Sequence, residues 1–308
     1  MYPMSSLNND EMVAFAVWSV EETRLPFGIY EQGLVDFQTR GSLQALDPGN
    51  FAFIIKKSGQ DWRVKTDEIR KWREKGVRFL VPSFSLFPKS FRQIHSPPRL
   101  LYYHGSLAGL RNFRLAIVGS REPSGLSLAW IENEIGDLLE RQNICIVSGG
   151  ARGIDQAAHR MALRKNRATA VFLPSGLFRI YPGSLSQWIK PVVEGGGVFL
   201  SEYAPYVTLR KSHFAQRNRL IAGLAQATLI MEARPRSGTL LTAQQAVEQG
   251  RPLFVVPSHP YDGNSQGGLH LLSEGATMVV DARDLLAFVQ AELQLNLLGI
   301  DLPPASFL

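Results

Sequence analysis

The chain has 308 residues, of which 45% are hydrophobic and 19% are charged, and its formal net charge is +6 at pH 7. This is the composition of an ordinary soluble globular protein, and the length allows one large α/β domain with a smaller one. No apolar run reaches 18 residues and the N-terminus lacks the pattern of a signal peptide, so we expect a cytoplasmic protein with no membrane partner.

Residues 1–80 contain short helical patterns separated by polar breaks, and none of these patterns has the spacing of a metal or catalytic site. They predict a small helical N-terminal domain. Prolines and interleaved aromatic residues follow in 81–100, which predicts an extended connector packed on the main domain.

Seven short apolar runs alternate with helix-length segments from Leu115 onward. This alternation predicts an α/β domain over 101–288, built on a parallel sheet that is buried on both faces. Cys145, the single cysteine, lies in the second run and is predicted to be a buried strand residue without a disulfide partner. The tail, 289–308, is expected to pack on the body or on a second subunit.

The first loop after a predicted strand is IVGSREPSG, where Ser120 and Arg121 follow a glycine at the point where a helix would begin. Backbone N–H groups there favour an anion, and Arg121 adds a full charge. The alternative is a tight turn that only needs its glycine. The spacing is not the dinucleotide fingerprint, and the next strand ends in SGG rather than in an acidic residue, which disfavours a Rossmann-type oxidoreductase.

The second loop is SGGARGIDQAAHRMAL. Gly149 and Gly150 would let a ligand approach the backbone closely, and Arg152 adds charge. Asp155 and His159 are four residues apart and share a helix face. We favour a structural or ligand-orienting role for this pair over acid/base catalysis, because no third group completes a catalytic arrangement.

The third loop is RKSHFAQRNRLIAGLA, which has four cations in its first ten residues. Lys211 and Phe214 are expected just before a predicted helix, and Arg217, Asn218 and Arg219 are expected within it. Cations for phosphates together with an aromatic face for a base are typical of single-stranded nucleic acid binding. The alternative is a solvated basic face.

The fourth loop follows ATLIM, and Ser237, Gly238 and Thr239 begin its helix beside two arginines. Since the carboxyl ends of parallel strands lie at one edge of a sheet, these loops should converge there. Repeated anion sites along an edge suit a chain of phosphates better than one small ligand.

The motifs resemble those of the bacterial DNA-processing protein A family, also called Smf. The matching stretches are IVGSR, SGGARGIDQAAHRMAL, YPGS, LSEYAP, FAQRNRLIAGLA and SGTLLTAQQAVEQGRPLFVVPS, in the order of that family. The resemblance implies an extended Rossmann domain that binds and protects single-stranded DNA, usually as a homodimer, and that helps to load the RecA recombinase during natural transformation. It also implies DNA contacts at Arg121, Lys211, Phe214, Asn218 and Arg219 and in the SGT loop.

The sequence departs from the family pattern at three places, where it has Phe178, Ser258 and Leu269. The winged-helix domain that many members have at the C-terminus is also not recognisable, so we expect a diverged member without it.

Two other functions compete with DNA binding. One is a phosphoribohydrolase that cleaves nucleoside monophosphates, which is disfavoured because Thr242 stands where the catalytic glutamate of such enzymes should be. The other is a nucleotide-sensing module of a stress or defence system. We expect a non-catalytic protein without cofactor or metal whose DNA-binding residues are Ser120, Arg121, Gly149, Gly150, Arg152, Lys211, Phe214, Arg217, Asn218, Arg219, Ser237, Gly238 and Thr239.

Overall fold

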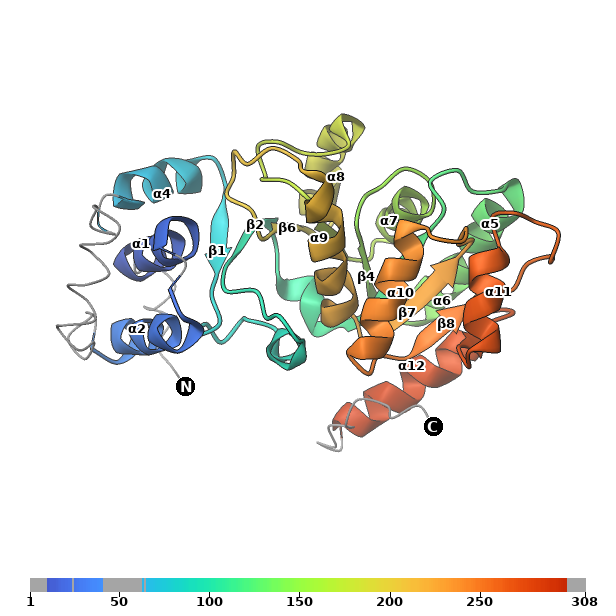
Figure 1. Ribbon diagram of the computed structural model, residues 1–308. Coiled ribbons are helices and arrows are strands. Elements are labelled where there is room, and N and C mark those ends of the chain that lie inside the picture. Colours follow the sequence, from blue (N-terminus) through green and yellow to red (C-terminus); the bar gives the residue numbers. More distant parts are fainter. Residues whose placement is uncertain (1–9, 24, 41–62, 64, 298–308) are drawn as a thin grey trace.

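A computed structural model describes residues 10–23, 25–40, 63 and 65–297. The strands in this part of the chain are β1 (Arg78–Leu80), β2 (Leu101–Gly105), β3 (Phe113–Gly119), β4 (Ile144–Ser148), β5 (Thr169–Phe172), β6 (Val198–Ser201), β7 (Ala227–Met231), β8 (Leu253–Val255) and β9 (Thr277–Met278). They form one sheet in the order β1-β2-β6-β5-β4-β3-β7-β8-β9 (Figure 1).

The seven strands from β6 to β9 in this order are all parallel, and each corresponds to one of the seven predicted apolar runs. The expected α/β, Rossmann-like fold is therefore confirmed. β1 and β2 extend the sheet as antiparallel strands beside β6. The sequence analysis predicted neither strand, because β1 is three residues long at the end of the expected helical domain and β2 directly follows the expected connector with its prolines.

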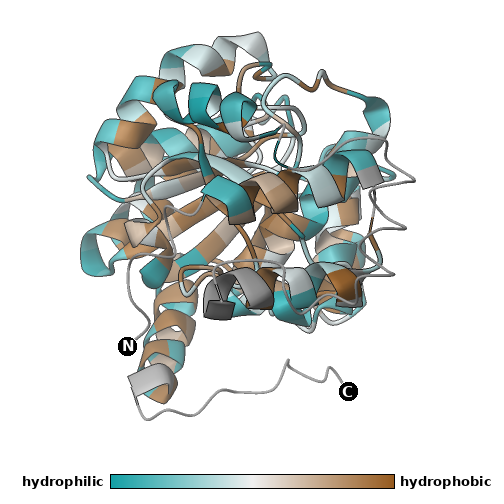
Figure 2. Cartoon of the chain, turned by 90° about the vertical axis from the view of Figure 1, so that its left-hand side faces the viewer, coloured by the Kyte–Doolittle hydropathy of each residue, from teal (hydrophilic) through white to brown (hydrophobic). Residues whose placement is uncertain are grey.

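Helices cover both faces of the sheet, and the hydrophobic residues gather on the strands between them (Figure 2). One face packs against α6 (Gly136–Arg141), α7 (Ile154–Arg164) and α12 (Ala282–Leu297). The other face packs against α8 (Ile189–Glu194), α9 (Lys211–Leu224) and α10 (Gly238–Glu248). Two layers of helices around a parallel sheet bury its strands on both sides, which explains why those strands are continuously apolar in sequence.

The remaining helical elements connect or extend these layers. They are α5 (Gly125–Trp130) and α11 (Gln266–Ser273), together with the short 3₁₀ or π segments η4 (Lys89–Gln93), η5 (Ala108–Arg111), η6 (Ile131–Ile135) and η7 (Gly183–Trp188). Within the expected connector, 81–100, Phe91 of η4 is fully buried and packs edge-on against Phe172 of β5. Buried aromatic contacts thus fix this segment on the sheet.

The N-terminal residues form α1 (Asp10–Trp18), η2 (Ser19–Thr23), α2 (Phe27–Arg40) and α4 (Lys65–Glu74), which lie beside β1 at one end of the molecule (Figure 1). Their aromatic side chains Trp18, Tyr30 and Trp72 belong to the same apolar core as Tyr102 of β2. The hydroxyl of Tyr102 also donates to the Glu21 carboxylate. The helical part is therefore joined to the sheet by shared packing.

The domain boundary expected after residue 80 falls at the end of β1, which is already part of the sheet. The boundary expected after residue 288 falls inside α12, which continues to Leu297. The last part of the expected tail, 298–308, lies outside the described residues. In the part of the chain that the structure describes, no helix is long and apolar enough to cross a membrane.

Candidate nucleic-acid interface

A cavity of about 360 Å³ opens at the carboxyl ends of β3 and β7. From β3 the chain adds β4, β5 and β6 on one side and β7, β8 and β9 on the other, so the strand order reverses between β3 and β7. Open α/β sheets bind their ligands at such a switch point, where two diverging loops leave space between them. The fold itself therefore positions this cavity, and its volume is in the range of small-ligand pockets.

Arg121 and Phe214 come together at the cavity, although they are far apart in sequence. Arg121 follows β3, and its guanidinium lies 5.5 Å from the centre of the Phe214 ring. Phe214 is the fourth residue of α9, which begins at Lys211, so Lys211 and Phe214 both lie in the helix rather than just before it as expected. The ring of Tyr181 also contacts Phe214, edge-on at 5.8 Å. The cation is held by a cation–π contact and stays exposed, so its N–H groups are free to meet an anion.

Arg217 is buried one turn further along α9. Only 6% of it is exposed, one Nη donates to the carbonyl of Phe172 at 3.1 Å, and its Nε has no partner. Burial lowers the pKa of Arg217 to about 10, with Asp155 acting in the opposite direction, so the side chain remains charged at neutral pH. A buried cation with an unused donor at a cavity wall is suited to an anionic ligand.

Gly149 makes the position of Arg217 possible. A Cβ on Gly149 would lie 1.4 Å from Nη1 of Arg217, so any larger residue would displace the guanidinium. Asp155 of α7 accepts hydrogen bonds from the backbone N–H groups of Gly149, at 3.2 Å, and Ala151, at 3.3 Å. Burial raises the pKa of Asp155, and Arg217 partly offsets this effect. The glycine loop and Asp155 thus form a support for Arg217.

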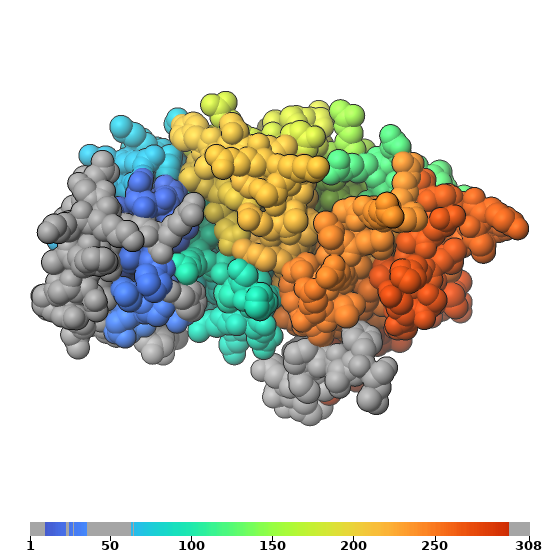
Figure 3. All heavy atoms as spheres, in the orientation of Figure 1, coloured from blue at the N-terminus to red at the C-terminus, as the bar shows by residue number. Residues whose placement is uncertain are grey.

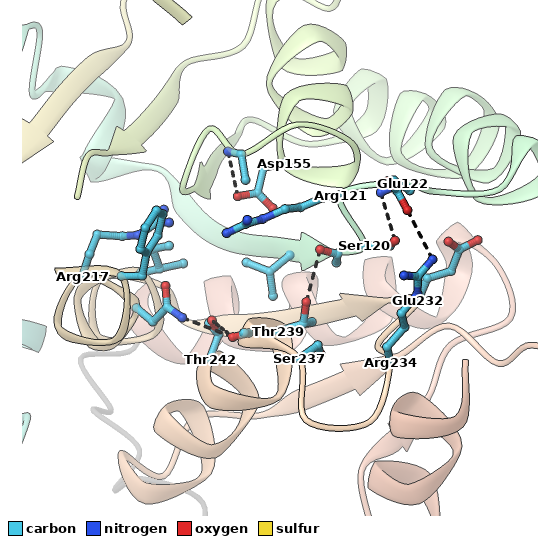
Figure 4. A pocket seen from close by; sticks show the side chains of 17 residues that line it. Ser120, Arg121, Glu122, Asp155, Arg217, Glu232, Arg234, Ser237, Thr239 and Thr242 are labelled. Atoms are coloured by element: carbon cyan, nitrogen blue, oxygen red, sulfur yellow. Dashed lines mark hydrogen bonds and ion pairs between the residues drawn. The ribbon is translucent and has the colours of Figure 1, made fainter. Parts of the chain in front are cut away.

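The N-terminus of α10 forms the opposite wall of the cavity (Figure 4). Thr239 donates to the carbonyl of Gly119 at 3.2 Å, and the Asn218 amide donates to the carbonyl of Gly238 at 3.2 Å. Ser237 does not cap the helix, and its hydroxyl has no partner. Uncapped N–H groups and the helix dipole make this end of α10 favourable for negative charge.

Glu232 is a cavity residue that the sequence analysis missed. It is 4% exposed and accepts hydrogen bonds from the backbone N–H and hydroxyl of Ser124 and from the hydroxyl of Ser127. Its φ of 49° is unusual for a non-glycine residue. Glu232 therefore joins the first loop to the fourth. The only sequence signal for it was a carboxylate directly after an apolar strand.

Glu122 and Arg234 form an ion pair of 3.4 Å on the rim beyond Glu232, and both side chains are exposed. The charge of Arg234 is therefore already paired on this side of the cavity. In Figure 4 the pair lies at the opposite end of the cavity from Arg217.

Eight of the thirteen predicted residues line the cavity: Ser120, Arg121, Phe214, Arg217, Asn218, Ser237, Gly238 and Thr239. The other five do not. Gly149 and Gly150 lie behind the wall, where Gly150 has a φ of 70° and packs against Leu185. Arg152 and Lys211 are exposed outside the lining, Lys211 at the first position of α9. Arg219 is turned away and donates to Glu202 at 2.5–2.6 Å, so its charge is paired elsewhere.

His159 is also remote from the cavity lining. It is fully buried, and its Nδ1 lies 2.6 Å from the Thr169 hydroxyl, which itself donates to the carbonyl of Ile146. Nδ1–H must therefore donate to this hydroxyl. Burial lowers the pKa of His159 to about 3, with Arg217 as a smaller cause, so the ring is neutral and joins α7 to β5. The described residues contain no cluster of His, Cys, Asp and Glu that could hold a metal ion.

Comparison with known proteins identifies relatives of this chain in sequence and in structure. The family model for DNA recombination-mediator protein A matches residues 78–290, which is more than half of the chain. The DNA processing protein DprA of Streptococcus pneumoniae is 39% identical over 210 residues, which are 67% of this chain and 73% of that protein. Protein Smf of Escherichia coli is 32% identical over 289 residues, which are 93% of this chain and 73% of that protein.

Two solved structures share the fold at 30% identity. The DNA processing protein A of Streptococcus pneumoniae superposes with a TM-score of 0.67 over 92% of this chain and 94% of that one. The DNA processing protein A of Helicobacter pylori, whose structure gives insight into its unique single-stranded DNA binding mode, superposes with a TM-score of 0.61 over 71% of this chain and 96% of that one.

Proposed function

The chain belongs to the DNA recombination-mediator protein A family, and from this premise we propose that it binds single-stranded DNA in the cavity between β3 and β7. The observation that supports this proposal most is the combination of Arg121 stacked on Phe214, buried Arg217 and the uncapped N-terminus of α10 around one cavity. Together they offer positive charge to phosphate and an aromatic face to a base.

We propose that binding depends little on the base sequence and that the chain binds single-stranded DNA much more tightly than duplex DNA. Phosphate contacts from cations and helix N-termini give affinity without reading the base, whereas stacking needs a base that is free of its partner strand. We propose protection of single-stranded DNA and its handover to the RecA recombinase by a homodimer as the wider role, which the resemblance of the motifs to the family implies; the description of the family as a recombination mediator supports a role in recombination.

We propose further that the cavity is not catalytic. Thr242, in the position of a phosphoribohydrolase glutamate, is 2% exposed and its hydroxyl lies 3.4 Å from the carbonyl of Gly238. The carboxylates that line the cavity are Asp155, Glu122 and Glu232, and each of them already has a hydrogen-bond or ion-pair partner. None is positioned as a free base.

The substitution Arg121→Ala tests this function, because Arg121 lines the cavity and is exposed. Charge-assisted hydrogen bonds contribute about 1.5–3 kcal/mol each, so the variant should bind oligo-dT at least about tenfold more weakly. The slope of log K against log salt should flatten by about 0.7 for each phosphate contact that is lost. Fluorescence anisotropy at two salt concentrations measures both quantities.

Arg111→Ala is the matched control, because Arg111 is exposed in η5 before β3, at the opposite edge of the sheet. It should bind like the parent chain. Duplex DNA and AMP complete the titration. If AMP binds tightly and oligo-dT does not, the chain is a nucleotide sensor, and release of free adenine from AMP would identify an enzyme instead.

A further inference from the structure

Lys75 and two aromatic rings form a cluster that the cavity does not include. The ammonium group of Lys75, in the turn after α4, lies 5.5 Å from the centre of the Phe178 ring and 5.7 Å from that of Tyr206. It also donates to the Tyr206 hydroxyl at 2.9 Å, and the two rings are 4.9 Å apart. Tyr206 is 48% exposed, so part of its ring is open to a ligand.

This cluster is connected to the cavity by two loops that are bonded to each other. The N–H of Phe178 donates to Pro205 at 2.8 Å, and that of Gly176 donates to Val207 at 2.9 Å. The first loop continues to Tyr181, which contacts Phe214 in the cavity. We call Lys75, Phe178, Tyr181 and Tyr206 the Tyr206 surface. In Figure 3 the gold segment of this surface borders the cyan residues of α4.

The charge of these loops suits a polyanion. Neither residues 156–193 nor residues 203–231 contain a single Asp or Glu. Arg179, Arg210 and Lys211 are exposed there, and within the described part of the chain none of them forms an ion pair. Glu202, the carboxylate just before the second segment, is paired with Arg219.

The opposite side of the cavity, unlike these loops, contains acidic residues. Its rim has the Glu122–Arg234 ion pair, and the following loop contains Asp262, which accepts hydrogen bonds from Asn264 and Ser265. Tyr261 is exposed there and its ring contacts that of His259. A negatively charged strand that leaves the cavity along residues 156–193 and 203–231 therefore meets no Asp or Glu of these segments, whereas on the other side it meets Glu122 and Asp262.

We propose that the Tyr206 surface is a second binding segment for the same DNA strand, running from the cavity to the N-terminal helices. A base stacks on Tyr206, and Lys75 contacts a phosphate. This inference rests on the proposed function of the cavity. Lys75 is suited to the role because two rings and a hydroxyl already fix its ammonium group, so binding would order little further.

Binding of oligo-dT of increasing length, from about 4 to about 16 nucleotides, tests the proposal, since this range covers the site sizes of single-stranded DNA-binding folds. Tyr206→Ala should bind short oligonucleotides like the parent chain and long ones about 5- to 100-fold more weakly. Tyr206→Phe should restore long-oligonucleotide binding because it keeps the ring. Lys75→Gln should flatten the salt slope for the long oligonucleotides only. Thermal unfolding of each variant checks that the fold is retained.

Tyr261→Ala tests whether the DNA strand leaves the cavity on the opposite side instead. This variant should bind oligonucleotides of every length like the parent chain. Parental binding of Tyr206→Ala at every length would overturn the proposal, and so would a loss of long-oligonucleotide binding in Tyr261→Ala alone. Arg121→Ala should weaken binding at every length. If the parent chain binds no oligonucleotide at all, the proposed function itself is wrong, which is a result distinct from failure of the second segment.

Discussion

Individual residues of the cavity have separable roles in the proposed complex. Arg121 and Phe214 contact each other, yet one would neutralise phosphate and the other would stack on a base. Charge contributes affinity that falls with salt, whereas stacking does not release counterions. The two contributions can therefore be distinguished by changing one residue at a time.

Phe214→Ala should weaken oligo-dT binding by about 1–3 kcal/mol with an unchanged salt slope, because it removes a stacked ring and no charge. Phe214→Leu is the matched control for lost apolar volume and should recover only a small part of the affinity. The measurement is anisotropy across a salt series. A flattening of the slope as large as that of Arg121→Ala would contradict a stacking role.

The sequence could identify the residue types of the site but not all of their positions. Arg217 and Arg219 are two residues apart, so helix geometry places them about 200° apart, but it does not say which of them faces the cavity. In the structure Arg217 faces the cavity through the space left by Gly149, whereas Arg219 pairs with Glu202. Both facts depend on contacts between segments far apart in the chain, as does the position of Glu232 beside Ser124.

At the scale of elements, the parallel strands were predictable because burial on both faces makes each of them a continuous apolar run. β1 and β2 were not, since short antiparallel strands of three and five residues next to prolines lack that pattern. The helix α7 was predictable from its apolar spacing, and its attachment to β5 through His159 adds a pH dependence that the sequence alone could not show.

His159 should make the fold less stable in acid. Its pKa in the folded protein is about 3, below the ordinary value of 6.5, so the unfolded chain binds a proton first as the pH falls. This stabilisation is complete above pH 6.5 and is lost toward lower pH, by up to about 1.4 kcal/mol for each pH unit in that window.

Urea unfolding of the parent chain and of His159→Asn between about pH 5 and about pH 8 measures this effect. Asparagine keeps a donor for the Thr169 hydroxyl but does not titrate, so the variant should lose less stability in acid than the parent does. Equal slopes in the two proteins would show that His159 is already protonated in the folded state or is not buried.

At the scale of the whole molecule, the site exists because a parallel sheet brings loops from distant parts of the chain to one edge. The sequence predicted this convergence from the order of its strands, and the structure shows that the first, second, third and fourth loops meet around one cavity. It could not predict that the loops around Phe178 and Tyr206 would also connect this cavity to Lys75 at the end of α4.

The most direct test of the central claim is a crystal structure of the chain with bound oligo-dT. We predict a nucleotide in the cavity between β3 and β7, with a phosphate within hydrogen-bond distance of Arg121 or the N-terminus of α10 and a base on Phe214. An oligonucleotide bound on another surface, with this cavity open and empty, would contradict the account.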